Sequence, residues 1–213
     1  MNIINSSKQE VVNALKKGKL TVCVVGLGRI GLPTAAVLAD AGAKVIGVDI
    51  DAGVVKRVNS GASSYRDEHG LIDLIRKTVD EGMLKATTDI LSAVSTSEFI
   101  IVCVPTPVDE NKVPDYSAIT ETCRRITEGL RRGSVVIIES TVGPGTVERL
   151  VVPLLERTGM KAGVDFGVAS CPERANPGQI LHTLETVPRI VGGINRQTTE
   201  AVAALYESTL GAK

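Results

Sequence analysis

The segment VVGLGRIG at residues 24–31 decides the fold of this chain. Its glycines are spaced G-x-G-x-x-G, directly after an apolar run and directly before a helical pattern, which is the full context of a dinucleotide-binding turn. Gly26 permits a tight turn, Gly28 lets the backbone approach a pyrophosphate, and Gly31 lets the helix pack close to the strand. The N–H groups and dipole at the start of that helix favour phosphate charge.

An acid follows the next apolar run at the place where such a site needs one. The run at 44–48 ends at Asp49, eighteen residues past Gly31. A carboxylate there accepts hydrogen bonds from the adenosine ribose, and its charge repels the extra phosphate of NADP. Asp51 adds to that repulsion. NAD is therefore the expected cofactor, with a purely structural glycine turn or another nucleotide as the alternatives.

Outward from this segment, short apolar runs alternate with helical patterns, which is typical of a parallel sheet covered by helices. Strands are expected at 20–25, 44–48, 99–104, 134–138, 166–170 and 189–191. Helices are expected at about 30–42, 51–59, 71–81, 115–131 (with Asp115 as N-cap), 144–158 and 196–210, the last closed by Gly211. The predicted class is α/β, a Rossmann-type doubly wound parallel sheet.

The N-terminal stretch carries Val11, Val12, Leu15 and, just after residue 19, Leu20 at roughly helical spacing. We expect an accessory helix packed on the outside of the fold. The predicted organisation is an N-terminal helical extension at 1–19 and one NAD-binding domain at 20–213.

Composition excludes several classes of protein. Acidic and basic residues number 24 each, so no strong field predicts nucleic acid or an anionic membrane as a partner. No apolar run is long enough to span a bilayer, and the N-terminus lacks a signal-peptide pattern, so a cytoplasmic location is expected.

The cysteines and histidines give no ligand pattern for a metal. None of the four cysteines forms a C-x-x-C pair, and His69 and His182 lie far apart in the sequence. No metal is expected. Cys23 and Cys103 fall within apolar runs and are expected to be small buried side chains.

Three later apolar runs end in unusual polar sequences. These are VPTP at 104–107, ESTVGPGT at 139–146 and CPERANPG at 171–178. Two prolines fix the first loop and hold Thr106 toward the cleft. Each sequence alone fits ordinary turn chemistry. In an open α/β sheet, however, ligands bind outside the carboxyl ends of the strands, so the three are expected to converge on one cleft.

Four motifs, taken in order, resemble the UDP-glucose/GDP-mannose dehydrogenase family, and the resemblance extends across residues 20–213. They are G-L-G-R-I-G-L-P, V-P-T-P, S-T-V-G-P-G-T and C-P-E-R-A-N-P-G. The P-E-R-x-x-P-G form resembles the branch that acts on UDP-N-acetylhexosamines, notably UDP-N-acetylmannosamine. The UDP-glucose branch more often carries a second acid where this chain has Pro177. That departure disfavours UDP-glucose, which remains the alternative substrate, and removes one possible catalytic carboxylate.

The resemblance implies a role for each matching residue. Those assigned to NAD are Gly26, Gly28, Arg29, Ile30 and Gly31 at the pyrophosphate, Asp49 at the ribose, and Pro105, Thr106 and Thr141 toward the nicotinamide half. Family members often have Tyr at the position of Arg29; because that contact is largely through backbone, NAD binding is expected to survive the change.

The resemblance also implies catalytic and substrate contacts. Thr141 and Glu173 would hold the hydrolytic water, with Glu173 as proton acceptor, and Arg174 and the backbone of Ala175 would contact the UDP-sugar. The family oxidises the sugar C6 alcohol to a carboxylate with two NAD, through an aldehyde trapped by a cysteine thiolate.

That nucleophile lies in a G-x-C-L-P-K-D-like segment, which this sequence lacks, and Cys171 does not match its position. The chain is therefore expected to be the NAD-binding portion of such an enzyme: inactive and monomeric alone, and homodimeric at full length. Two alternatives stay open. They are a hydroxyacid dehydrogenase of the 6-phosphogluconate type and a free-standing NAD-binding regulatory module.

Overall fold

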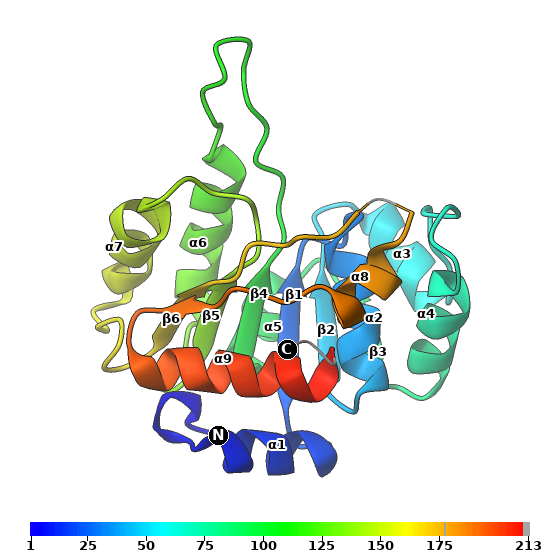
Figure 1. Cartoon of the computed structure of the whole chain (residues 1–213), viewed down its shortest axis with the longest axis horizontal. Coiled ribbons are helices and arrows are strands. Elements are labelled where there is room, and N and C mark those ends of the chain that lie inside the picture. Colours follow the sequence, from blue (N-terminus) through cyan, green and yellow to red (C-terminus); the bar gives the residue numbers. More distant parts are fainter. Residues whose placement is uncertain (177, 211–213) are drawn as a thin grey trace.

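The computed structural model describes residues 1–176 and 178–210, so the expected caps and contacts at Pro177 and Gly211 lie outside the described residues. Within these ranges one seven-stranded sheet has the order β3-β2-β1-β4-β5-β6-β7 (Figure 1). The strands are β1 Thr21–Val25, β2 Lys44–Val48, β3 Leu84–Thr87, β4 Phe99–Val102, β5 Val135–Ile138, β6 Gly167–Ser170 and β7 Gly192–Gly193.

The first six strands pair in parallel, and β7 pairs antiparallel with β6. The six parallel strands have the order of two mononucleotide-binding halves. The order in which successive strands are added to the sheet reverses between β1 and β4. The predicted Rossmann-type doubly wound sheet is thus confirmed. Its topology leaves a crevice at the carboxyl ends of β1 and β4.

Helices cover both faces of this sheet (Figure 1). They are α1 Lys8–Lys16, α2 Gly31–Asp40, α3 Ala52–Asn59, α4 Leu71–Asp80, α5 Ile90–Thr96, α6 Ser117–Gly129, α7 Val152–Leu155, α8 Ile180–Thr186 and α9 Arg196–Thr209. No helix in the described ranges combines the length and the apolar character needed to cross a bilayer.

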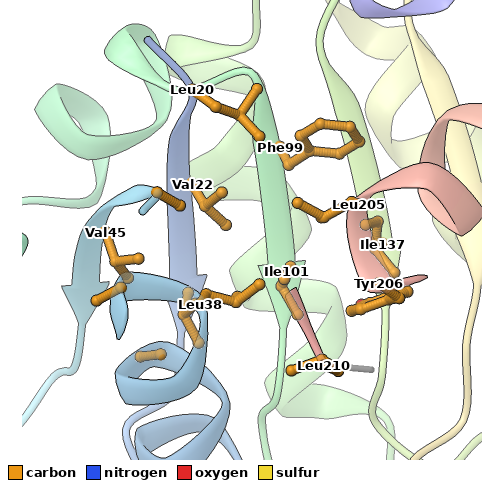
Figure 2. Close-up of a cluster of buried hydrophobic side chains, with 14 of the residues drawn as sticks. Leu20, Val22, Leu38, Val45, Phe99, Ile101, Ile137, Leu205, Tyr206 and Leu210 are labelled. Carbon is orange, nitrogen blue, oxygen red and sulfur yellow. The ribbon is translucent and has the colours of Figure 1, made fainter. Parts of the chain in front are cut away.

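Successive strand residues supply two separate cores, because neighbouring side chains point to opposite faces of a sheet. Val22 and Phe99 pack against α2 and α9 on one face, as Figure 2 shows. Cys23 and Ile100 pack against α5 and α6 on the other. A sheet buried on both faces needs continuous apolar strands, which explains why TVCVV and FIIV carry no alternation of polar residues.

The predicted accessory helix is α1, which lies along α9 (Figure 1). A capping box begins it: the Ser7 hydroxyl accepts from the Glu10 backbone N–H, and the Glu10 carboxylate accepts from the Ser7 N–H. Val11 and Leu15 are buried in the core that contains α9. The helix therefore extends that core at the edge away from the crevice.

Three elements were not predicted: β3, α5 and α8. Strand β3 is a short edge strand in which Lys85 is exposed. Helix α5 is rich in β-branched residues and serine, which have weak helix propensity, and it depends on Asp89 as N-cap. Strand β3 and helix α5 are held by tertiary packing more than by a local sequence signal.

Other predicted boundaries need correction. The strand expected at 189–191 is wrong, since the pairing with β6 occurs at Gly192–Gly193. Asp115 accepts a hydrogen bond from the Ser117 N–H, but the N-cap of α6 is Tyr116, and the helix ends at Gly129.

The helical stretch expected at 144–158 begins at Val147 with a π-helical turn over Val147–Val151, before α7. It continues as a 3₁₀ turn after α7. The π-helical turn ends two residues before Pro153, which has no N–H for a regular helical bond.

Candidate functional site

The glycine turn joins β1 to α2 with almost no space to spare. Gly26 has a φ of +93°, and a Cβ there would lie 2.5 Å from the carbonyl oxygen of Cys103. A Cβ on Gly31 would lie 1.9 Å from the carbonyl oxygen of Gly26. The roles predicted for these two glycines, a tight turn and close helix packing, agree with this geometry.

Gly28 differs, because the nearest atom to a Cβ built there is the Tyr65 hydroxyl oxygen at 4.0 Å. The space beside it belongs to the cleft, which Gly28, Arg29 and Ile30 line. Among the described residues, the backbone N–H groups of these three residues have no acceptor within the chain. Free N–H groups at the start of a helix form an anion-binding site.

Asp49, at the carboxyl end of β2, faces the same turn. One carboxylate oxygen accepts from the Leu27 N–H at 2.9 Å, and the other accepts from the Asp51 N–H at 3.0 Å. The side chain therefore ties β2 to the glycine turn while it lines the cleft. Each carboxylate oxygen keeps a further lone pair for a ligand hydroxyl.

The cleft has a volume of about 530 Å³ and opens at the carboxyl ends of β1, β2, β4 and β5. This volume is typical of a ligand site. Nine of the predicted site residues line it: Gly26, Gly28, Arg29, Ile30, Asp49, Pro105, Thr106, Thr141 and Glu173. The predicted convergence of the three strand-end sequences is thus confirmed.

The remaining predicted residues lie outside this lining. Gly31 is buried beneath the turn. The Arg174 guanidinium donates to the carbonyl oxygen of Pro188 at 3.1 Å, and the Ala175 N–H donates to the Glu173 carboxylate at 2.7 Å. The 173–175 segment thus borders the cleft through Glu173, with Arg174 turned toward the chain before β7.

Three hydrogen bonds hold the threonine loops in place. The Ser140 hydroxyl accepts from the Val104 N–H at 3.0 Å and donates to the Val104 carbonyl at 2.8 Å, which joins the ends of β4 and β5. The Gly143 N–H donates to the Tyr116 hydroxyl at 2.9 Å. Tyr116 ends the long loop that rises from β4 to α6 in Figure 1.

A buried ionic cluster lies at the floor of the cleft, which Glu139 lines. The Glu139 carboxylate accepts from the Arg189 guanidinium and from the Tyr206 hydroxyl, each at 2.6 Å. The Arg189 guanidinium also lies over the Tyr206 ring, 4.7 Å from its centroid. Burial, together with the Glu139 charge, raises the pKa of Tyr206 well above its ordinary value, so its hydroxyl remains a donor.

Sequence reasoning missed this cluster and part of the cleft wall. A charged residue directly after the apolar run VVII was a signal for Glu139, but its partners are 50 and 67 residues away. The cleft is further lined by Ile50 and by Ala118, Glu121, Thr122 and Arg125 of α6. The helical pattern of α6 gives no local sign of which face meets a ligand.

Comparison with known proteins identifies the relationship. Residues 20–210 match the family model described as "UDP-glucose/GDP-mannose dehydrogenase family, NAD binding domain". The chain belongs to this family. The predicted resemblance is confirmed, and NAD is the cofactor of the matched domain.

Individual relatives of the chain support the same family assignment. The UDP-N-acetyl-D-mannosamine dehydrogenase of Pyrococcus horikoshii is 39% identical over 189 residues, which cover 89% of this chain and 44% of the relative. The NDP-N-acetyl-D-galactosaminuronic acid dehydrogenase of Ralstonia nicotianae is 39% identical, with 88% and 45% covered. The solved structure of the P. horikoshii UDP-D-ManNAc dehydrogenase has a TM-score of 0.86 at 38% identity, with 91% and 46% covered. The chain spans less than half the length of these relatives.

The geometry fits the cofactor of this family. Gly28 leaves open space where a side chain would stand, free N–H groups face it, and Asp49 lies at the neighbouring strand end. Thr106 and Thr141 border the same cleft. The described residues can therefore hold a pyrophosphate, a ribose and a nicotinamide along one groove.

The cysteines are poorly placed for the nucleophilic chemistry that this family resemblance implies. Cys103 lines the cleft, which corrects the expectation that it is simply buried, and its thiol donates to Glu139 at 3.4 Å. Cys23, as predicted, and Cys171 are buried. Burial raises the pKa of Cys171 to about 11 and that of Cys123 to about 12, and raises those of Cys23 and Cys103 well above the ordinary value.

We therefore expect slow alkylation of the folded chain. At about pH 8, iodoacetamide should modify each cysteine more than about tenfold more slowly in the native protein than in urea, because the thiolate is the reactive form. Peptide mass spectrometry against time would measure this. Rapid native labelling of Cys103 or Cys171 would contradict the raised pKa values.

Proposed function

We propose that this chain is the NAD-binding portion of a nucleotide-sugar 6-dehydrogenase. The enzyme oxidises the C6 alcohol of a UDP-N-acetylhexosamine to the uronic acid with two NAD, and UDP-N-acetylmannosamine is the first candidate substrate. The observation that carries the proposal is the convergence of the glycine turn with the VPTP, ESTVGPGT and CPERANPG sequences on one cleft. Bound NAD supplies the hydride acceptor.

The cofactor residues divide along the groove. The N–H groups of Gly28, Arg29 and Ile30 hold the pyrophosphate, since they face the cleft at the start of α2. Asp49 accepts the adenosine ribose hydroxyls. Pro105 fixes the loop that carries Thr106, and Thr106 and Thr141 contact the nicotinamide half. Gly26 and Gly31 shape the turn at the pyrophosphate, and Gly26 also lines the cleft.

The catalytic contribution of this chain centres on Thr141 and Glu173. Both line the cleft, and Glu173 follows β6, three residues beyond Ser170. They hold the hydrolytic water, and the Glu173 carboxylate takes its proton. The Glu173 carboxylate already accepts the Ala175 N–H, which fixes its orientation toward the cleft.

Substrate contacts are assigned to Arg174 and the backbone of Ala175. The relatives named above act on, or are named for, N-acetylated sugars, which supports a UDP-N-acetylhexosamine over the alternative, UDP-glucose. The position that carries the second acid of the UDP-glucose branch is Pro177, outside the described residues. To contact a nucleotide sugar, Arg174 would release the Pro188 carbonyl.

For the whole protein we propose a cytoplasmic homodimer in which residues 1–19 extend the NAD-binding domain at 20–213. A second half, with the nucleophilic cysteine, would complete the active site. The support is the length of the relatives, of which this chain covers 44–46%. This chain alone is then inactive, and NAD-dependent oxidation of a UDP-sugar by the purified chain would contradict that.

The primary test is calorimetric titration with NAD and with NADP. We expect saturable NAD binding and much weaker NADP binding. Asp49→Asn should weaken NAD binding about tenfold and reduce the preference for NAD over NADP. The substitution removes the carboxylate charge but keeps one oxygen for the Leu27 N–H. Asp89→Asn is the matched control: it removes the same charge from the N-cap of α5 and should change neither affinity.

Equal binding of NAD and NADP to the native chain would reject the role of Asp49. Absence of binding by both would reject the assignment of the glycine turn as a working cofactor site in this chain.

A further inference from the structure

A buried carboxylate outside the cleft connects the cofactor turn to the start of α8. Glu68 precedes α4, and its side chain is only 1% exposed. One carboxylate oxygen accepts from the Gly178 N–H at 2.6 Å, and the other accepts from the Ile180 N–H at 2.9 Å. These bonds span more than a hundred residues of sequence and hold the start of α8.

The positive charge beside this carboxylate comes from the glycine turn. The Arg29 guanidinium lies 3.8 Å from Glu68, forms an ion pair with Asp67 and covers the Tyr65 ring at 5.1 Å from its centroid. The Tyr65 hydroxyl in turn lies beside Gly28. The 65–68 segment therefore contacts the cofactor turn on one side and holds the 178–180 backbone on the other.

A buried carboxylate is costly unless it is paired and hydrogen-bonded. Glu68 meets that requirement only while the turn places Arg29 beside it and the 178–180 backbone supplies both N–H donors. Glu68 is thus satisfied only when the glycine turn and the 178–180 backbone are both in place. A ligand that orders the turn therefore favours the ordered state of the 178–180 backbone.

We propose that Glu68 is a positioning residue that couples NAD binding at the glycine turn to ordering of residues 173–176 and 178–180, the segment that carries Glu173, Arg174 and Ala175. This inference rests on the proposed function for the assignment of that segment to the UDP-sugar. NAD holds the turn and Arg29 in place, and Glu68 then holds the segment for the nucleotide sugar. Because coupling is reciprocal, the loss of Glu68 weakens NAD binding without any contact between Glu68 and NAD.

The test is amide hydrogen exchange of the chain with and without saturating NAD, alongside NAD titration. In the native chain, NAD should slow exchange at Gly178 and Ile180 by about fivefold or more. Glu68→Gln replaces one acceptor oxygen with an N–H₂ group, which cannot accept from a backbone N–H. It should remove the NAD-dependent change at both amides and weaken NAD affinity about fivefold.

The matched control is Asp73→Asn, which removes one charge from α4 at a side chain that is 85% exposed and paired with Arg76. It should leave both readouts unchanged. If Glu68 were purely structural, Glu68→Gln would raise the exchange rate at both amides equally with and without NAD and would leave NAD affinity unchanged. That result overturns the proposal.

The native chain decides the question even if Glu68→Gln does not fold. NAD binding with no change at Gly178 and Ile180 rejects the coupling and leaves the proposed function standing. Absence of NAD binding instead counts against the cofactor role of this chain.

Discussion

Gly31→Ala is expected to abolish high-affinity NAD binding and to destabilise the fold. The new Cβ would lie 1.9 Å from the Gly26 carbonyl oxygen and 3.1 Å from the Cys103 Cβ, so either the turn or the start of α2 must move. Overpacking of this kind costs about 1–3 kcal/mol of unfolding free energy. The displaced N–H groups should lower NAD affinity by about 10- to 100-fold. Urea unfolding and calorimetric titration measure the two effects.

Two other glycines separate these effects. Gly28→Ala has free space in the protein and should reduce NAD affinity with little change in stability, because its Cβ would occupy the cleft. Gly192→Ala, with no atom within 4 Å of the new Cβ, is the neutral control. If Gly31→Ala bound NAD as the native chain does, the predicted close packing of turn and helix would be wrong.

Arg189→Ala is expected to give the largest loss of stability. Its side chain is 8% exposed and that of Glu139 is fully buried, so the substitution leaves a carboxylate without its cation. Breaking a buried pair in this way costs about 3–5 kcal/mol of unfolding free energy. The result should appear as a lower urea midpoint. The double variant Glu139→Gln with Arg189→Met should recover much of the loss, because no unpaired charge remains.

An exposed ion pair provides the control for this experiment. Arg196 and Glu200 lie one turn apart on α9 with side chains 89% and 55% exposed. Arg196→Ala should change the unfolding free energy by less than about 0.5 kcal/mol. A similarly small effect of Arg189→Ala would show that the cluster at the floor of the cleft does not hold the 189–206 region to β5.

This cluster also bears on the cleft above it. Glu139 directly follows β5, and the next two residues are Ser140, which joins the β4 loop, and Thr141, which lines the cleft. Arg189 and Tyr206 therefore fix the base of the loop that carries Thr141. The C-terminal part of the chain thus supports the cleft without lining it.

Much of the fold was predictable because its signals are local. The G-x-G-x-x-G turn, the apolar runs and Asp49 need only neighbouring residues to be recognised, and a parallel sheet brings all its strand ends to one edge. The position of Thr106, Thr141 and Glu173 in one cleft follows from that rule. Strand β3 and helix α5 were missed because their local propensities are weak and only packing selects them.

The sequence by itself determined the fold class, the cofactor and the wall of strand-end loops that lines the cleft. Only the tertiary structure decided that Glu139 pairs with Arg189 and Tyr206, and that Glu68 binds the 178–180 backbone. The physical reason is the range of the interactions. Turns, caps and strand periodicity arise from residues a few positions apart, whereas a buried charge finds partners wherever the folded chain provides them.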